Sequence, residues 1–128
     1  MKRVVDYMRG PALVIDEACS VGEARERLST YGVRRMLVVD ADGALIGLVR
    51  AVELSWVPAS HCVRDCTSPD VVMCQPQDSI DSAREVMSDL RLRSLPVVVA
   101  GQVIGVLHWD DVERASLEPR SRAVREYV

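Results

Sequence analysis

Hydrophobic residues along the chain follow two spacings, one typical of helices and one typical of strands. After Ser20 and again after Ser79, apolar residues recur every three or four positions, as in an amphipathic helix with one buried stripe. Both serines stand where a helix N-cap is expected, and Ser20 with Glu23 has the spacing of a capping box. The pattern predicts two helices with matching buried faces. The two stripes are Val21, Ala24, Leu28 and Tyr31, and Ile80, Ala83, Met87 and Leu90.

Short apolar runs predict the strands. One run precedes each helix and two follow it, at 12–15, 36–40 and 45–50 in the first half and at 71–74, 95–100 and 103–108 in the second. Asp42-Gly43 marks a turn between two of these runs, because glycine permits a positive φ. A further helix closes each half, at 51–56 and at 109–117. The predicted order is strand, helix, strand, strand, helix, twice.

The two halves are copies of one unit. The segment Ser20-Val21-x-x-Ala24-Arg25-Glu26 returns as Ser79-Ile80-x-x-Ala83-Arg84-Glu85, and Leu45-Ile46-Gly47 returns as Val103-Ile104-Gly105. The repeated Arg-Glu pair falls outside the buried stripe, so we expect it on a solvated face. Two copies are too few for a solenoid. We therefore expect two half-domains that share an interface, with a ligand-binding cleft between them.

The composition fits a folded protein of the cytoplasm. Of the 128 residues, 48% are hydrophobic and 27% are charged, so a packed core is expected rather than disorder. The net charge of −3 argues against a fold-wide basic surface for nucleic acid. The first residues lack the pattern of a signal peptide, and the apolar runs are too short for a membrane span. We expect a cytoplasmic protein that binds neither nucleic acid nor membrane.

The cysteines do not stand at equivalent positions in the two copies. A disulfide framework built into the repeat would be duplicated with it, so free thiols are expected at Cys19, Cys62, Cys66 and Cys74. The alternative is a metal or redox sensor, although the spacing is not that of a common zinc ribbon. Its site would be made by His61, Cys62, Cys66 and Cys74.

In order and in duplicate, these motifs resemble the CBS (cystathionine β-synthase) domain family. The resemblance is carried by residues 5–8, 20–24, 36–40 and 47–54 in the first copy, and by 63–67, 79–83, 95–98 and 105–112 in the second. It implies an α/β fold of two tandem β-α-β-β-α CBS repeats packed as one pseudo-twofold module. The expected boundaries are 3–58 and 61–117, followed by a polar C-terminal segment, 118–128, that is either a short helix or a tail.

The resemblance also implies a function. Members of the family commonly bind adenosine-containing ligands, among them AMP, ADP, ATP and S-adenosylmethionine, in clefts between the copies, and they usually dimerise and regulate an attached or partner protein. We therefore expect a stand-alone regulatory module that forms a homodimer and acts on an unidentified partner, with Trp56 and Trp109 as candidate dimer contacts. Because a fold assigns no ligand by itself, a dimerising scaffold with empty clefts is the alternative.

The second copy holds the stronger predicted ligand site. The resemblance implies that Asp111 stands where family members carry an aspartate whose two carboxylate oxygens accept hydrogen bonds from both ribose hydroxyls. His108 stands where family members carry a Ser or Thr whose hydroxyl helps to bind phosphate. The alternative role for Asp111 is that of a helix-start residue that interacts with free amides. Arg9 stands in the first copy where the second copy has Thr67. The predicted site consists of Asp111, His108, Arg93, Thr67, Val72 and Pro96.

The first copy departs further from the family's pattern. Arg50 has the hydroxyl position and Glu53 has the aspartate position, while Arg34 and Arg35 stand just before the second strand. A guanidinium suits phosphate because its fork donates two parallel hydrogen bonds. These four residues form the weaker predicted site, in which Arg50 either binds phosphate or pairs with Glu53 in an empty cleft.

Catalytic motifs are absent from the sequence. It contains no nucleophile elbow, P-loop, dinucleotide-binding or zinc-protease motif. The two histidines, His61 and His108, are not repeated and suggest no triad. The sequence therefore predicts a binding module rather than an enzyme.

Overall fold

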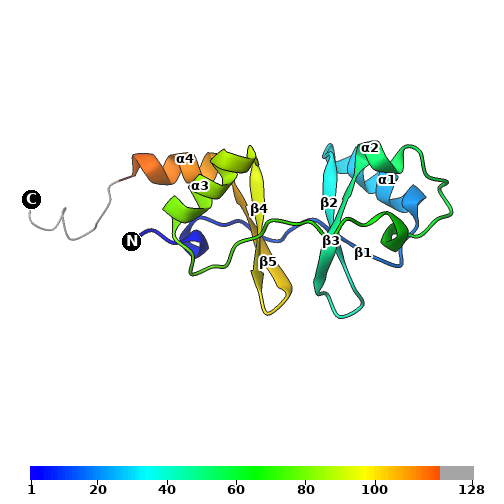
Figure 1. Cartoon of the computed structure of the whole chain (residues 1–128), viewed down its shortest axis with the longest axis horizontal. Helices are drawn as coiled ribbons and strands as arrows, with labels where there is room; N and C mark the ends of the chain where they lie inside the picture. Colours follow the sequence, from blue (N-terminus) through cyan, green and yellow to red (C-terminus); the bar gives the residue numbers. More distant parts are fainter. Residues whose placement is uncertain (119–128) are drawn as a thin grey trace, which may run out of the picture. The chain divides into compact units, whose positions relative to one another are not determined.

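Each repeat contributes its first segment to the unit formed by the other repeat. The computed structural model describes residues 1–118, which divide between two compact units. One unit is Leu13–Val71, and the other combines Met1–Ala12 with the chain from Val72 onward (Figure 1). Of the predicted polar segment 118–128, all residues after Glu118 lie outside the described part of the chain.

Two short 3-10 helices hold the exchanged segments in place. The first, η1 (Val4–Asp6), joins the second repeat through the N–H of Val4, which donates to the carbonyl oxygen of Asp78 at 2.9 Å. The second, η2 (Val63–Cys66), joins the first repeat through the N–H of Val63, which donates to the carbonyl oxygen of Cys19 at 2.8 Å. Both valines are fully buried, so each exchanged segment adds an apolar side chain to the core of the unit it joins.

The Leu13–Val71 unit has a three-stranded sheet and two helices. The strands are β1 (Val14–Asp16), β2 (Arg35–Val39) and β3 (Leu45–Arg50), with β1 parallel to β2 and β2 antiparallel to β3. The helices α1 (Val21–Tyr31) and α2 (Ala51–Leu54) lie on the same face of the sheet (Figure 1). The buried core between these layers consists of Ile15, Val21, Ala24, Leu28, Met36, Val38, Val49, Leu54 and Val63.

The other unit is built from an antiparallel hairpin and two helices. Its strands are β4 (Ser94–Val99) and β5 (Gln102–His108), and its helices are α3 (Ile80–Leu90) and α4 (Trp109–Leu117). Ala100 and Gly101 both have positive φ angles, 49° and 81°, as a two-residue turn requires to match the strand twist. The buried core consists of Val4, Cys74, Ile80, Ala83, Met87, Leu95, Val97, Leu107, Val112 and Ala115.

The strand predicted at 71–74 does not form. Cys74 alone makes a β-bridge, to Val97, whereas Val72 and Met73 are exposed. Pro96 is the second-copy equivalent of Leu37. Because proline has no backbone N–H, it cannot donate a hydrogen bond to a strand paired alongside it. The prediction is wrong for this segment. In the first copy, the corresponding strand forms but begins at Val14 rather than at residue 12.

The predicted helix N-caps are confirmed, but the buried stripes are shorter than predicted. The Oγ of Ser20 accepts a hydrogen bond from the N–H of Glu23 at 3.1 Å, and Ser79 caps α3 in the same way. Tyr31 and Leu90, the last predicted members of the stripes, are 62% and 54% exposed. Each helix ends directly after them at a residue with left-handed backbone, so these two side chains stand at the helix ends, beyond the last buried residues, Leu28 and Met87.

Arg25 and Arg84 link neighbouring helices. Arg25 on α1 donates a hydrogen bond from Nε to the carbonyl oxygen of Leu54 at 3.0 Å, at the end of α2. Arg84 on α3 donates to the hydroxyl of Ser116 near the end of α4. The prediction of a solvated face is therefore wrong for both arginines, which are half-buried. Arg25 supplies charged donors to carbonyl groups at the end of α2 and just beyond it.

Candidate functional site

Asp111 is buried in the first turn of α4 and is held by an arginine. Its side chain is 2% exposed, and Arg9 donates to it twice, from Nε to Oδ2 and from Nη2 to Oδ1, both at 2.8 Å. The Nη2 of Arg114, one turn further along α4, lies 3.4 Å from Oδ1. The two oxygens that were predicted to accept a ribose diol therefore already accept a guanidinium.

Arg9 keeps the Asp111 carboxylate ionised. Its hydrogen bonds lower the pKa of Asp111 below the ordinary value, and the charges of Arg9 and Arg114 act in the same direction, while burial opposes them. In return, the hydrogen bonds and charge of Asp111 raise the pKa of Arg9. The ion pair is therefore the stable form of both groups at neutral pH.

The backbone of Arg9 is fixed against β5. Arg9 and Val106 exchange two backbone hydrogen bonds, of 2.8 and 2.7 Å. Gly105 makes this approach possible, since a Cβ at that position would lie 2.7 Å from the carbonyl oxygen of Arg9. The guanidinium thus reaches Asp111 from a rigid attachment point.

Ser68, not Thr67, is the structural equivalent of Arg9. Ser68 and Leu48 exchange two backbone hydrogen bonds of 2.9 Å, beside Gly47, just as Arg9 does with Val106 beside Gly105. The sequence-based match of Arg9 with Thr67 is therefore off by one residue. Thr67 belongs to the Leu13–Val71 unit, where its hydroxyl donates to the carbonyl oxygen of Val63 at 2.9 Å, so it does not share a unit with Asp111.

The other predicted residues of the second-copy site lie in the same unit as Asp111. His108 is half-buried at the N-cap position of α4, where its side chain makes no capping hydrogen bond. Arg93 is exposed, and its carbonyl oxygen accepts the N–H of Trp109 at 2.8 Å. Arg93 directly precedes β4, His108 ends β5 and Asp111 lies in the first turn of α4, so all three stand near the junction of these elements. Pro96 is buried within β4, and Val72 is 39% exposed.

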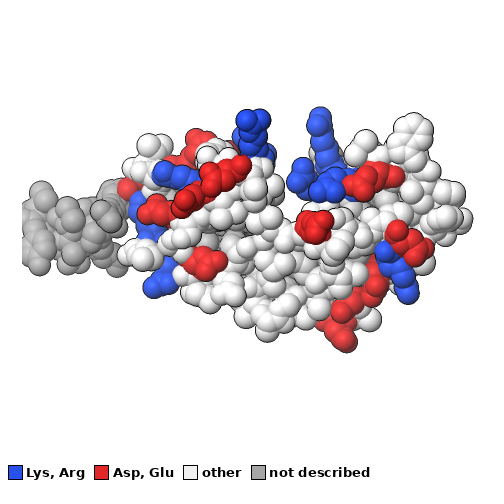
Figure 2. All heavy atoms as spheres, in the orientation of Figure 1, with Lys and Arg blue, Asp and Glu red and all other residues white. Residues whose placement is uncertain are grey.

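Arginines of the first copy line an open pocket. Arg34, Arg35 and Arg50 surround a volume of about 410 Å³ together with Ala51 and Val52. Arg35 on β2 is the direct cross-strand partner of Arg50 on β3, an arrangement in which like charges repel. Figure 2 shows basic side chains gathered over this end of β2. In the second copy, Ser94 and His108 form the equivalent cross-strand pair.

Glu53 partly neutralises this pocket. The Nη1 of Arg50 lies 3.0 Å from the Oε1 of Glu53, so the predicted Arg50–Glu53 pairing is present. The two side chains are 41% and 49% exposed, and solvent therefore screens the pair. Arg34 and Arg35 are exposed and keep the pocket's charge positive.

Sequence reasoning did not identify the partners of Asp111. The contact of Arg114 with Asp111 could have been predicted, because residues three apart on a helix are neighbours on its surface. No local sequence pattern links Arg9 to Asp111, because the two residues are 102 positions apart.

The alternative metal or redox site does not assemble within residues 1–118. In this part of the chain, no group of three or more His, Cys, Asp or Glu side chains is arranged to hold an ion. Cys62 and Cys66 lie in one unit and Cys74 in the other. Burial raises the pKa of the Cys74 thiol to about 12, which is unsuitable for a thiolate ligand.

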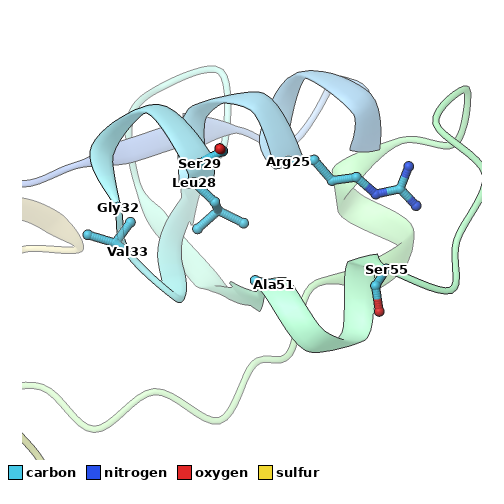
Figure 3. A pocket seen from close by; sticks show the side chains of 7 residues that line it. All are labelled: Arg25, Leu28, Ser29, Gly32, Val33, Ala51 and Ser55. Carbon is cyan, nitrogen blue, oxygen red and sulfur yellow. The ribbon is translucent and has the colours of Figure 1, made fainter.

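A second pocket, of about 500 Å³, lies between α1 and α2 (Figure 3). Figure 3 shows Arg25 extending from α1 toward the end of α2 that carries Ser55. No predicted ligand residue lines this pocket. Its lining residues are Arg25, Leu28, Ser29, Gly32, Val33, Ala51 and Ser55.

Two segments of the chain match the model of a known protein family. The model of the CBS domain family matches residues 4–55 and 63–118. The chain therefore belongs to the CBS domain family and carries a tandem pair of CBS repeats, in a mixed α/β fold as predicted. Among the residues that the structure describes, no helix has both the length and the apolar composition needed to cross a membrane.

The fold is similar to that of solved CBS pairs. The CBS-pair protein CBSX2 from Arabidopsis thaliana has a TM-score of 0.78 and 26% identity, with 91% of this chain and 94% of that chain covered. The structure of CBSX2 in complex with AMP has a TM-score of 0.77 and 27% identity, with 91% and 97% covered.

Curated relatives share only part of their length with this chain. Inosine-5'-monophosphate dehydrogenase from Nitrosopumilus maritimus is 27% identical over 73% of this chain, which spans 20% of the dehydrogenase. The A-adding tRNA nucleotidyltransferase from Aquifex aeolicus is 26% identical over 91% of this chain, which spans 14% of that enzyme. These are CBS-domain matches at low identity, and CBS-pair proteins are generally regulatory rather than catalytic.

Proposed function

We propose that this CBS pair is a regulatory module that binds an adenosine-containing ligand and holds the ligand's phosphate with Arg34, Arg35 and Arg50. The observation that carries the proposal is the cross-strand placement of Arg35 opposite Arg50 in an open pocket. Like charges placed directly opposite each other destabilise a sheet. An anion bound between them would remove that cost.

The chemistry of the pocket suits a phosphate. Guanidinium groups bind phosphate oxygens through parallel, charge-assisted hydrogen bonds. The volume of about 410 Å³ lies within the range of small-molecule sites, roughly 300–1,000 Å³. A phosphate that pairs with Arg50 would replace Glu53 as its partner. The two carboxylate oxygens of Glu53 could then accept hydrogen bonds from a ribose diol.

AMP is the first ligand to test, because CBSX2, at 27% identity, is known in complex with AMP. ADP, ATP and S-adenosylmethionine belong to the same proposed class. All contain adenosine, and they differ in the charged group that the arginines would meet.

Calorimetry with AMP and with adenosine tests the proposal. Arg35→Ala and Arg50→Ala should each weaken AMP binding by about 10- to 100-fold, because each removes charge-assisted hydrogen bonds of about 1.5–3 kcal/mol. Adenosine, which lacks the phosphate, should be affected less. Arg64→Ala, at an exposed arginine of η2 outside the pocket, makes the same charge change and should leave binding unaltered.

The alternative function predicts a different result. If the folded wild type binds none of these ligands, the module is better described as a dimerising scaffold. Equal losses from Arg50→Ala and Arg64→Ala would contradict the arginine pocket while leaving nucleotide binding in place.

We also propose that the module forms a homodimer through its helices and regulates a partner protein. Apolar side chains on or beside α1 and α2 are strongly exposed, with Trp56 at 86%, Val52 at 68% and Tyr31 at 62%, as at interaction surfaces. Trp109 packs against the core of its own unit and is not retained as a contact. Light scattering should give the mass of a dimer at tens of micromolar, and Trp56→Ser should shift it toward the monomer.

A further inference from the structure

The two copies differ at one equivalent position beside their candidate sites. Arg9 is attached to β5 at Val106, and Ser68 is attached to β3 at Leu48, each by two backbone hydrogen bonds. The attachment is the same, but the side chain is a long cation in one copy and a short hydroxyl in the other. The carboxylates of the two copies, Asp111 and Glu53, therefore have different neighbours at this position.

In the second copy, Arg9 uses the whole carboxylate. It donates to both oxygens of Asp111 at 2.8 Å, which is the bidentate geometry that makes such pairs strong. The carboxylate is 2% exposed, and Arg114 lies against the same Oδ1 at 3.4 Å.

In the first copy, nothing equivalent covers Glu53. The Oγ of Ser68 accepts a hydrogen bond from the N–H of Asp70 at 3.4 Å, within its own loop. Glu53 is 49% exposed and is paired with Arg50, itself a lining residue of the open pocket. The carboxylate of this copy is therefore within reach of a ligand.

We propose that Arg9 closes the second-copy site by occupying Asp111, so that the chain binds one nucleotide, at the Arg34–Arg35–Arg50 pocket. The location of that nucleotide rests on the proposed function. To bind Asp111, a ribose diol would have to displace a bidentate ion pair and replace it with hydrogen bonds whose donors carry no charge, which are weaker. Arg9 thus determines which copy binds ligand.

Arg9→Ser, which installs the residue of the equivalent position, tests this by counting bound AMP in equilibrium dialysis. We expect one AMP per chain for the wild type and two for Arg9→Ser. Adding Asp111→Asn to Arg9→Ser should return the count to one. Arg64→Ser makes the same change at an exposed site and should leave the count at one. A folded Arg9→Ser variant with the wild-type count would overturn the proposal.

Asp111→Asn in the wild-type background provides a second measurement if Arg9→Ser does not fold. It removes the buried charge and leaves Arg9, whose side chain is 59% exposed, in contact with water. The AMP count should be unchanged, because Asp111 is not open to ligand in the wild type. Loss of one bound AMP would overturn the proposal.

The two proposals fail in different ways. A wild type that binds no AMP contradicts the arginine pocket. The proposal for Arg9 is judged by the difference between Arg9→Ser and the wild type, and a gain of one AMP supports it whatever the wild-type count.

Discussion

The guanidinium of Arg25 donates a 3.0 Å hydrogen bond from Nε to the carbonyl oxygen of Leu54, and so joins α1 to the end of α2. It also donates to the carbonyl oxygen of Val57, in the segment that follows. The short helix α2 directly follows Arg50 of the candidate pocket. The position of the pocket therefore depends on a contact made by a residue that does not line it.

Arg25→Ala should destabilise the protein by about 1–3 kcal/mol, because the carbonyl oxygens of Leu54 and Val57 lose a charged donor. Urea unfolding followed by circular dichroism measures the change. Arg27→Ala, on the same helix, breaks only a partly exposed 3.6 Å ion pair with Glu23 and should cost less than about 1 kcal/mol. Equal costs for the two variants would contradict the linking role of Arg25.

The Arg9–Asp111 pair should make stability depend on pH in the acid range. Because the pKa of Asp111 is lowered in the folded state, the unfolded chain binds the proton first as the pH falls. The contribution is fully present above the unfolded pKa of about 3.9 and is lost as the pH falls through the lower folded pKa.

Asp111→Asn provides the comparison for this pH dependence. It lacks the titrating group, so the difference in unfolding free energy between wild type and variant should shrink as the pH is lowered below about 4. Chemical unfolding at a series of pH values measures it. A difference that does not change with pH would show that Asp111 titrates alike in both states.

Gly47→Ala should be strongly destabilising. A Cβ there would lie 2.2 Å from the carbonyl oxygen of Ser68, so the backbone pairing of Ser68 with Leu48 must shift, at a cost of about 1–3 kcal/mol or more. Thermal unfolding measures the loss. Gly32→Ala is the control, because its Cβ would meet nothing within 4 Å and only its positive φ of 64° is penalised, by about 1–2 kcal/mol.

Cys74 should be the last thiol to react with an alkylating reagent in the folded protein. It is buried, and its pKa is raised to about 12, so little reactive thiolate forms at pH 8. Cys62 is half-buried and should react earlier. Mass spectrometry of peptides after timed labelling gives the order, and early labelling of Cys74 would contradict the buried placement.

Several features of the fold could be predicted because they depend on residues close together in the sequence. Ser20 caps its helix through a residue three positions away, and the Leu45–Arg50 strand begins and ends where the apolar run does. Two of the predictions that are wrong, for Tyr31 and for the strand at 71–74, concern where an element meets the rest of the unit. Helical spacing alone does not show that the core ends one turn before Tyr31.

For the candidate site, the residue types were predicted but not their contacts. The Arg50–Glu53 pair could be foreseen because its members lie three positions apart in the chain. The cross-strand pairing of Arg35 with Arg50 also needs the register of the β2–β3 ladder, which includes a shift between Val38 and Val39. A ligand role for Asp111 was expected, and the competing arginine was not.

The sequence by itself determined the duplicated order of elements, the helix caps and the repeated glycines of β3 and β5, because these act through local backbone geometry that each copy carries in full. Only the tertiary structure decided that each copy's first segment packs into the other unit, and that Arg9 there meets Asp111. The physical reason is that such contacts join residues far apart in the chain, 102 positions for Arg9 and Asp111, and which side chain reaches a buried carboxylate depends on how the segments pack.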